Sequence, residues 1–133
     1  MNQRTSIRFA PHREVVVGDD AAVGEARRIA HRLAGDLGGD EQAATRAGLV
    51  ATELGTNLLR HADPGGWLLL RPAPPRQIEI LAVDRGPGIR DLAAAIEGRA
   101  PAPKGLGCGL ASVRRASALF DCHTRVDSGT VVL

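Results

Sequence analysis

The feature that most constrains the fold of this chain is the run of residues 78–83, Ile-Glu-Ile-Leu-Ala-Val. It combines alternation with a nearly continuous apolar end, a pattern typical of a central strand packed on at least one face. Asp84 follows directly, and then come Gly86, Pro87 and Gly88. Because ligand sites of α/β sheets usually lie where such strands end, the sequence predicts a candidate site at Asp84. An ordinary strand-to-loop turn is the alternative, since turns use the same residue types.

A second pattern places a carboxylate and an amide on one face of a predicted helix. Glu53 and Asn57 are four residues apart, so on a helix they stack on the same face. A neighbouring apolar stripe consists of Ala47, Val50, Leu54 and Leu58. Asn57 can offer Mg²⁺ the hard oxygen ligand that this ion prefers, and Glu53 can orient or deprotonate a nucleophile. A solvated helix face with a local Glu–Arg pair is the alternative interpretation.

A third pattern is a glycine-rich entry into a predicted helix over residues 110–118. Gly105, Gly107 and Gly109 follow a loop-forming stretch with two prolines at residues 100–104. Backbone N–H groups and the positive end of the helix dipole make such an entry a candidate phosphate site. A Rossmann fingerprint would need a preceding strand, and a Walker A loop would end in Gly-Lys-Ser/Thr, whereas Lys104 precedes the glycines. Both rival motifs are therefore disfavoured.

Helical and extended runs alternate along the rest of the chain. One helix is predicted from the candidate caps Asp19 and Asp20 to about Leu37, and a second from the cap Asp40 to just before Asp63. The remaining predicted elements are strands at residues 5–9, 14–17, 67–71, 78–84, 120–126 and 130–133, and a short helix at 91–97. The first two strands are expected at an edge as a hairpin around residues 10–11, and the next two as antiparallel neighbours joined across residues 72–75.

Composition bounds the class of protein. The 133 residues suit one domain, and with 44% apolar but only 2% aromatic residues the core must be filled by aliphatic side chains. The sequence has no apolar run long enough for a bilayer and no signal-peptide core near its first residues. Cys108 and Cys122 fit a reducing cytosol and lack metal-site spacing. A net charge of +2, one Trp and no Tyr argue against nucleic-acid binding. The chain is therefore expected to be cytoplasmic.

Taken in order, the three patterns resemble the nucleotide-binding boxes of the GHKL (Bergerat-fold) ATPases, which include gyrase, histidine kinases and anti-sigma-factor serine kinases. Glu53 and Asn57 are similar to the N box, Asp84-x-Gly86-x-Gly88 to the G1 box, Gly105-x-Gly107-x-Gly109-Leu110 to the G2 box, and Gly129-Thr130 to the closing Gly-Thr. The resemblance extends from about Asp19 onward. Within the superfamily the chain looks most similar to small bacterial switch kinases, which share the Asp-x-Gly-Pro-Gly-Ile form of G1.

The resemblance implies a fold: an α/β (α+β) two-layer sandwich in which helices cover one face of a mixed, mostly antiparallel sheet. It implies one HATPase-like ATP-binding domain over residues 1–133, with residues 89–104 as the ATP lid. It also implies site roles, with Glu53 as general base, Asn57 on Mg²⁺ and Asp84 on adenine. The other residues implied to bind the nucleotide are Gly86, Gly88, Lys104, Gly105, Gly107, Gly109, Leu110 and Thr130.

The implied activity is that of a serine/threonine protein kinase in a partner-switching stress response. It would transfer the γ-phosphate of ATP to a serine of a STAS-type antagonist protein, docked near Arg27, Arg28, His31 and Thr56. The rival is a non-catalytic ATP-binding regulator of a PP2C-type phosphatase or a sigma factor, and a histidine-kinase catalytic domain ranks third. Pro101 and Pro103 stiffen the lid relative to switch kinases, which puts turnover in more doubt than binding. A homodimer is also considered, whereas no membrane partner is expected.

Overall fold

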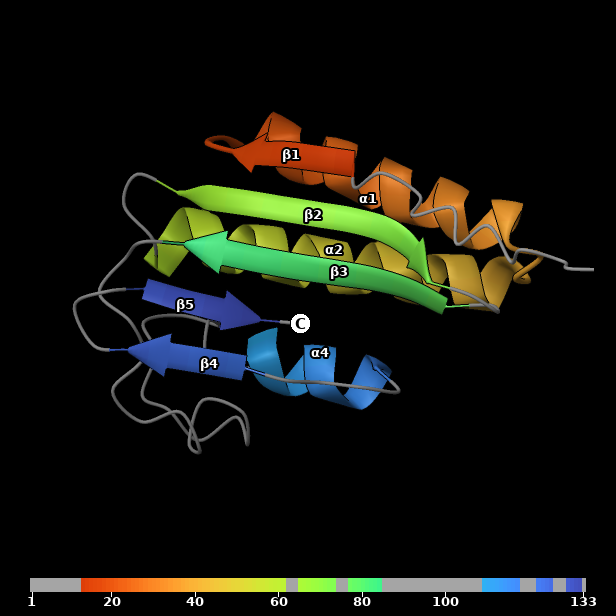
Figure 1. Cartoon of the computed structure of the whole chain (residues 1–133). Coiled ribbons are helices and arrows are strands. Elements are labelled where there is room, and N and C mark those ends of the chain that lie inside the picture. Colours follow the sequence, from red (N-terminus) through yellow and green to blue (C-terminus); the bar gives the residue numbers. More distant parts are fainter. Residues whose placement is uncertain are drawn as a thin grey trace, which may run out of the picture.

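The computed structural model describes residues 13–61, 65–73, 77–84, 109–117, 122–125 and 129–132. Within these residues, three helices cover one face of a five-stranded sheet (Figure 1). The helices are α1 (Asp20–Asp36), α2 (Glu41–His61) and α4 (Gly109–Ala116); the strands are β1 (Arg13–Val17), β2 (Gly66–Ala73), β3 (Gln77–Asp84), β4 (Cys122–Arg125) and β5 (Gly129–Val132). The expected two-layer sandwich is confirmed.

The sheet has the strand order β1-β2-β3-β5-β4. All of the pairings between described strands are antiparallel, so the mixed character expected of the sheet does not appear in this part of the chain. β1 lies at one edge, as predicted for residues 14–17. The predicted strand at residues 5–9, the hairpin around residues 10–11 and the helix at 91–97 lie outside the described residues.

Local capping signals define the ends of the two long helices. The carboxylate of Asp19 accepts a hydrogen bond from the backbone N–H of Ala22 at 2.8 Å, and α1 ends before Gly38, whose φ is +84°. The carboxylate of Asp40 accepts from the N–H of Ala43, also at 2.8 Å, and starts α2. Both predicted helices are confirmed, with Asp19 rather than Asp20 as the cap of the first.

The hairpin of β2 and β3 is longer than predicted. Pro72, placed in the connection by the sequence, lies in β2 opposite Ile78. Its missing N–H is tolerated because β1 pairs with β2 only between Gly66 and Leu70, so beyond Leu70 one side of β2 is an edge among the described residues. An ion pair between Arg71 and Glu79, with nitrogen and oxygen 2.7 Å apart, joins the two strands in this extension.

The core lies between the sheet and the helices, and among the described residues the largest fully buried side chains are aliphatic: Leu54, Leu68, Leu70 and Val17. Alternate residues of β1, β2 and β3 point into it, as in Val15 and Val17 of β1. The helices contribute Val23, Ala26, Ile29 and Ala30 from α1, Ala51, Leu54 and Leu58 from α2, and Leu110 and Val113 from α4. A chain with few aromatic residues therefore fills its interior as its composition indicates.

Two details of the helices differ from the prediction. In α1, the spacing of Val23, Ala26, Ala30, Leu33 and Leu37 in the sequence predicts one buried stripe. Leu33 and Leu37 are only partly covered, whereas Ile29 and Ala34 are buried. The helix predicted over residues 110–118 ends at Ala116, because the hydroxyl of Ser117 donates to the carbonyl of Val113 at 2.6 Å and competes with the helical pattern. None of the described helices is both long and apolar enough to cross a membrane.

Candidate functional site

The polar face of α2 carries Glu53 and Asn57 four residues apart, as the sequence predicted. Both side chains are partly buried. Within the described part of the chain, neither forms a side-chain hydrogen bond or an ion pair, so no local Glu–Arg pair is found there. Their oxygen atoms are therefore available to a ligand, and their donor chemistry suits a hydrated divalent cation beside a hydroxyl group.

The apolar face of α2 determines the direction in which its polar face points. Leu54 and Leu58 are buried against the sheet. Gly55 is buried too, and it allows close contact with Val23 of α1 and Leu68 of β2. Because these contacts fix the rotation of the helix about its axis, Glu53 and Asn57 are held away from the core.

Asp84 is the last residue of β3 and is partly buried. Its register partner is Gly66 of β2, and a Cβ atom on Gly66 would lie 2.8 Å from Cδ2 of Leu58. The end of β3 and the last turns of α2 therefore meet beside Gly66. We call this region the Asp84 end of the sheet (Figure 1). Since Asn57 directly precedes Leu58, the structure brings two of the predicted site residues into one region.

The remaining described site residues belong to α4 and β5. Gly109 and Leu110 form the first turn of α4, which runs away from the Asp84 end of the sheet (Figure 1). The side chain of Leu110 is buried in the core. Thr130 precedes Val131, which is the register partner of Val83, so its backbone lies beside the end of β3. The predicted site residues Gly86, Gly88, Lys104, Gly105 and Gly107 lie outside the described residues.

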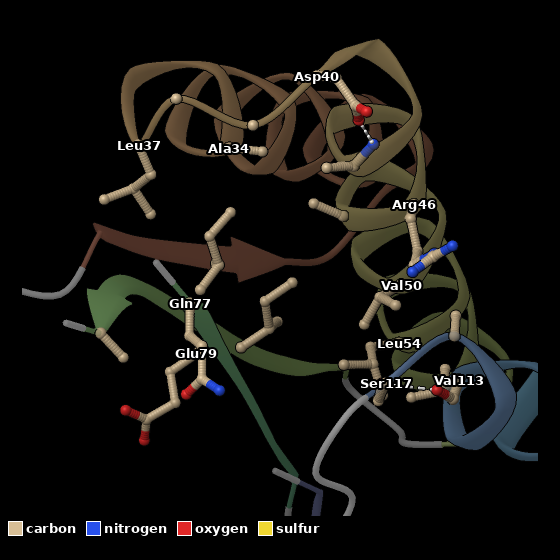
Figure 2. Close-up of a pocket in the computed structure, with 18 residues that line it drawn as sticks. Ala34, Leu37, Asp40, Arg46, Val50, Leu54, Gln77, Glu79, Val113 and Ser117 are labelled. Carbon is tan, nitrogen blue, oxygen red and sulfur yellow. Dashed lines mark hydrogen bonds between the residues drawn. The ribbon is translucent and has the colours of Figure 1, made fainter. Parts of the chain in front are cut away.

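A cavity of about 740 Å³ lies at the opposite end of the sheet, between the α1–α2 connection, the start of β3 and the end of α4 (Figure 2). Its walls include Leu37, Val50, Leu54 and Val113. The carboxylate of Asp40 beside it is engaged in capping α2. None of the described residues predicted for the site lines this cavity, so it is separate from the Asp84 end. No sequence motif pointed to it, because the residues that line it come from α1, α2, β2, β3, α4 and the residues that follow α1 and α4.

Among the described residues, no group of three or more His, Cys, Asp or Glu side chains could hold a metal ion.

Comparison with known proteins agrees with this arrangement. Residues 16–133 match the family model described as the histidine kinase-like ATPase domain. The serine/threonine-protein kinase RsbT of Bacillus subtilis (strain 168) is 26% identical over 134 residues, which cover 99% of this chain and 95% of RsbT. The matched range includes all three motifs, and the relationship inferred from them is confirmed.

Proposed function

This chain belongs to the histidine kinase-like ATPase family, and from that premise we propose that it is a serine/threonine protein kinase of the switch type. It transfers the γ-phosphate of ATP to a serine of a STAS-type antagonist protein in a cytoplasmic partner-switching stress response, as one domain over residues 1–133. The observation that carries the proposal is the presence of Glu53 and Asn57 on one helix face, without partners among the described residues, next to the Asp84 end of the sheet. The name of the relative RsbT supports the type of activity.

The nucleotide is bound between α2, the first turn of α4 and the lid. The carboxylate of Asp84 accepts a hydrogen bond from the exocyclic amine of adenine, with Gly86 and Gly88 allowing close approach of the ring. Backbone N–H groups of Gly105, Gly107, Gly109 and Leu110 bind the phosphates. Lys104 neutralises the charge of the terminal phosphate. Thr130 of β5 is the last of the proposed nucleotide-binding residues.

The metal requirement follows from the chemistry of α2. The amide oxygen of Asn57 binds Mg²⁺ together with phosphate oxygens. The ion, when bound, offsets the negative charge of the phosphates during transfer.

Phosphoryl transfer uses Glu53 as the general base. Its carboxylate accepts the proton of the acceptor serine while the serine oxygen bonds to the γ-phosphorus. The bond from that phosphorus to the bridging oxygen breaks, and ADP leaves with the electron pair. Since positioning provides most of such catalysis, basal ATP hydrolysis without the acceptor should be very slow.

A second candidate function is a non-catalytic regulator that binds ATP and a protein such as a PP2C-type phosphatase or a sigma factor. Pro101 and Pro103 in the lid favour it, because a stiff lid closes less readily over the γ-phosphate. Incubation of the purified chain with γ-labelled ATP, Mg²⁺ and purified STAS-type proteins separates the two. The kinase yields a phosphoserine on one STAS protein, and a Ser→Ala change there abolishes the label. ATP-dependent binding of that protein without transfer selects the regulator.

A further inference from the structure

Gly55 is a buried residue of α2 that faces both α1 and the sheet. A Cβ atom on this residue would lie 3.1 Å and 3.3 Å from the two γ-carbons of Val23, and 3.5 Å from Cδ1 of Leu68. Val23 is buried, and Leu68 is completely inaccessible to solvent. A methyl group at residue 55 would therefore fit between α2, α1 and β2 only if its neighbours moved by a few tenths of an ångström.

A second tight contact holds the same helix three residues further on. Cδ2 of Leu58 is 2.8 Å from the position that a Cβ atom on Gly66 would take, and the Cβ of Asp84 is 3.2 Å from it. Asn57 lies between these two contacts in the sequence of α2. The position of Asn57 relative to Asp84 therefore depends on how closely α2 packs against its neighbours at Gly55 and at Leu58.

We propose that Gly55 is a positioning residue for the metal-bound nucleotide. The lack of a side chain at residue 55 sets the depth of α2 against Val23 and Leu68, and thereby the distance from Asn57 to the Asp84 end of the sheet. This inference rests on the proposed function, because it takes Asn57 as the ligand of Mg²⁺ and Asp84 as the partner of adenine.

The expected displacement follows from the packing. Carbon atoms prefer separations of about 3.5–4.0 Å, so an added methyl group at residue 55 must open the contact with Val23 by a few tenths of an ångström. Val side chains have little freedom at χ1, so the helix moves rather than the side chain. The atoms nearest to the Cβ position of Gly55 belong to α1 and β2, so we expect Asn57 to shift more than Asp84. The magnesium-dependent part of ATP binding should suffer more than the adenine contact.

The test compares four variants with the wild-type chain: Gly55→Ala, Val23→Ala, the double variant Val23→Ala/Gly55→Ala, and the control Gly35→Ala. Gly35 is an exposed glycine of α1 with nothing within 4 Å of its Cβ position. For each variant, calorimetry gives the dissociation constant of ATP in EDTA and in Mg²⁺, and thermal unfolding gives Tm. The ratio of the constant in EDTA to the constant in Mg²⁺ reports the contribution of the metal.

We expect the ratio to fall roughly threefold or more in Gly55→Ala, since small misplacements of a binding group are costly. It should return to the wild-type value in the double variant, where the methyl group added at residue 55 occupies the space vacated by the side chain of Val23. Gly35→Ala should keep the wild-type ratio, and Val23→Ala is the single-variant reference for the double variant. A folded Gly55→Ala chain with a lower Tm but an unchanged ratio would show a packing role alone and overturn the inference.

The remaining outcomes of the experiment also test the inference. If Gly55→Ala does not fold, the double variant carries the test, and a ratio that stays low there overturns the inference. If the wild-type chain binds ATP equally in Mg²⁺ and in EDTA, the metal site of the proposed function fails and this inference with it. That failure is recognised in the wild-type titration, before any variant is compared.

Discussion

Gly66 and Asp84 are register partners at the point where β2 begins and β3 ends, and a Cβ atom on Gly66 would lie 3.2 Å from that of Asp84. The same atom would clash with the carbonyl oxygen of Val83 and would lie 2.8 Å from Leu58 of α2. Only glycine fits between the strand that presents Asp84 and the helix that presents Asn57. The packing of the sheet against α2 thus brings together two groups that are 27 residues apart in the sequence.

The first prediction concerns the choice of nucleotide at Asp84. A carboxylate accepts from the amine of adenine, whereas guanine would place a carbonyl against it and leave two acceptors facing each other. Because an unsatisfied buried acceptor costs about 1–3 kcal/mol, ATP should bind roughly tenfold tighter than GTP. Asp84→Ala should remove most of this preference, whereas Asp36→Ala, at an exposed carboxylate of α1, should preserve it. Calorimetric titration measures both, and equal affinities of the wild-type chain for ATP and GTP would contradict the assignment.

The second prediction separates binding from chemistry on α2. Asn57→Ala should weaken magnesium-dependent ATP binding, while Glu53→Gln should keep the nucleotide and lose phosphoryl transfer by about 10²–10⁴-fold if Glu53 is the general base. Gln42→Ala changes an exposed amide on the same helix and should alter neither quantity. Titration and transfer of labelled phosphate to the acceptor are measured side by side. Full transfer by Glu53→Gln would leave Glu53 without a catalytic role.

The part of the site that depends on spacing within one helix could be predicted from the sequence. Asp40 and Ala43 are three residues apart, so their capping hydrogen bond is set by local geometry. The shared face of Glu53 and Asn57 follows in the same way from the helical repeat. These features need no knowledge of the rest of the fold.

The features that depend on distant partners could not be predicted. The position of Pro72 within β2 depends on where β1 stops pairing with β2. That point is set by the register between these two strands, which are far apart in the sequence. In the sequence, Gly66 is predicted to be a turn residue and Gly55 a helix residue. Only the packing of α1, α2 and the sheet shows that Gly66 has no room for a side chain and that a side chain at Gly55 would press on Val23. The cavity beside Leu37 and Val113 likewise results from elements far apart in the sequence.

The third prediction tests the packing that supports the site. The side chain of Leu54 lies on the buried face of α2, where the residue is 2% exposed, whereas Leu49 on the same helix is 46% exposed. Leu54→Ala should lower the free energy of unfolding by about 2–5 kcal/mol, since it removes buried methyl groups and leaves a cavity. Leu49→Ala, the matched control, should change it by less than about 1 kcal/mol. Urea unfolding followed by circular dichroism gives both values, and similar losses for the two variants would be inconsistent with the described orientation of α2.

The last prediction concerns the acceptor protein, which we expect to dock on the outer surface of the first two helices. Arg27, Arg28 and His31 are exposed on α1, and Thr56 is partly buried on α2. Among the described residues, Arg28 has no ion pair, whereas His31 contacts Glu41 at 3.2 Å. Arg28→Glu should therefore weaken binding of the STAS-type protein several-fold, mainly by slowing association, and make that binding less sensitive to salt. The affinity of the Arg28→Glu variant for ATP should stay unchanged.

Arg13→Glu provides the control for this change, because Arg13 is an exposed arginine on the edge strand β1 and is not among the residues of the proposed docking surface. Surface plasmon resonance at two salt concentrations measures the association and dissociation rates of each variant with the STAS-type protein. A loss in Arg13→Glu that matches the loss in Arg28→Glu would point to net charge as the cause. Unchanged kinetics in Arg28→Glu would place the partner on another surface, because a reversed charge inside an interface alters association even where it adds little to affinity.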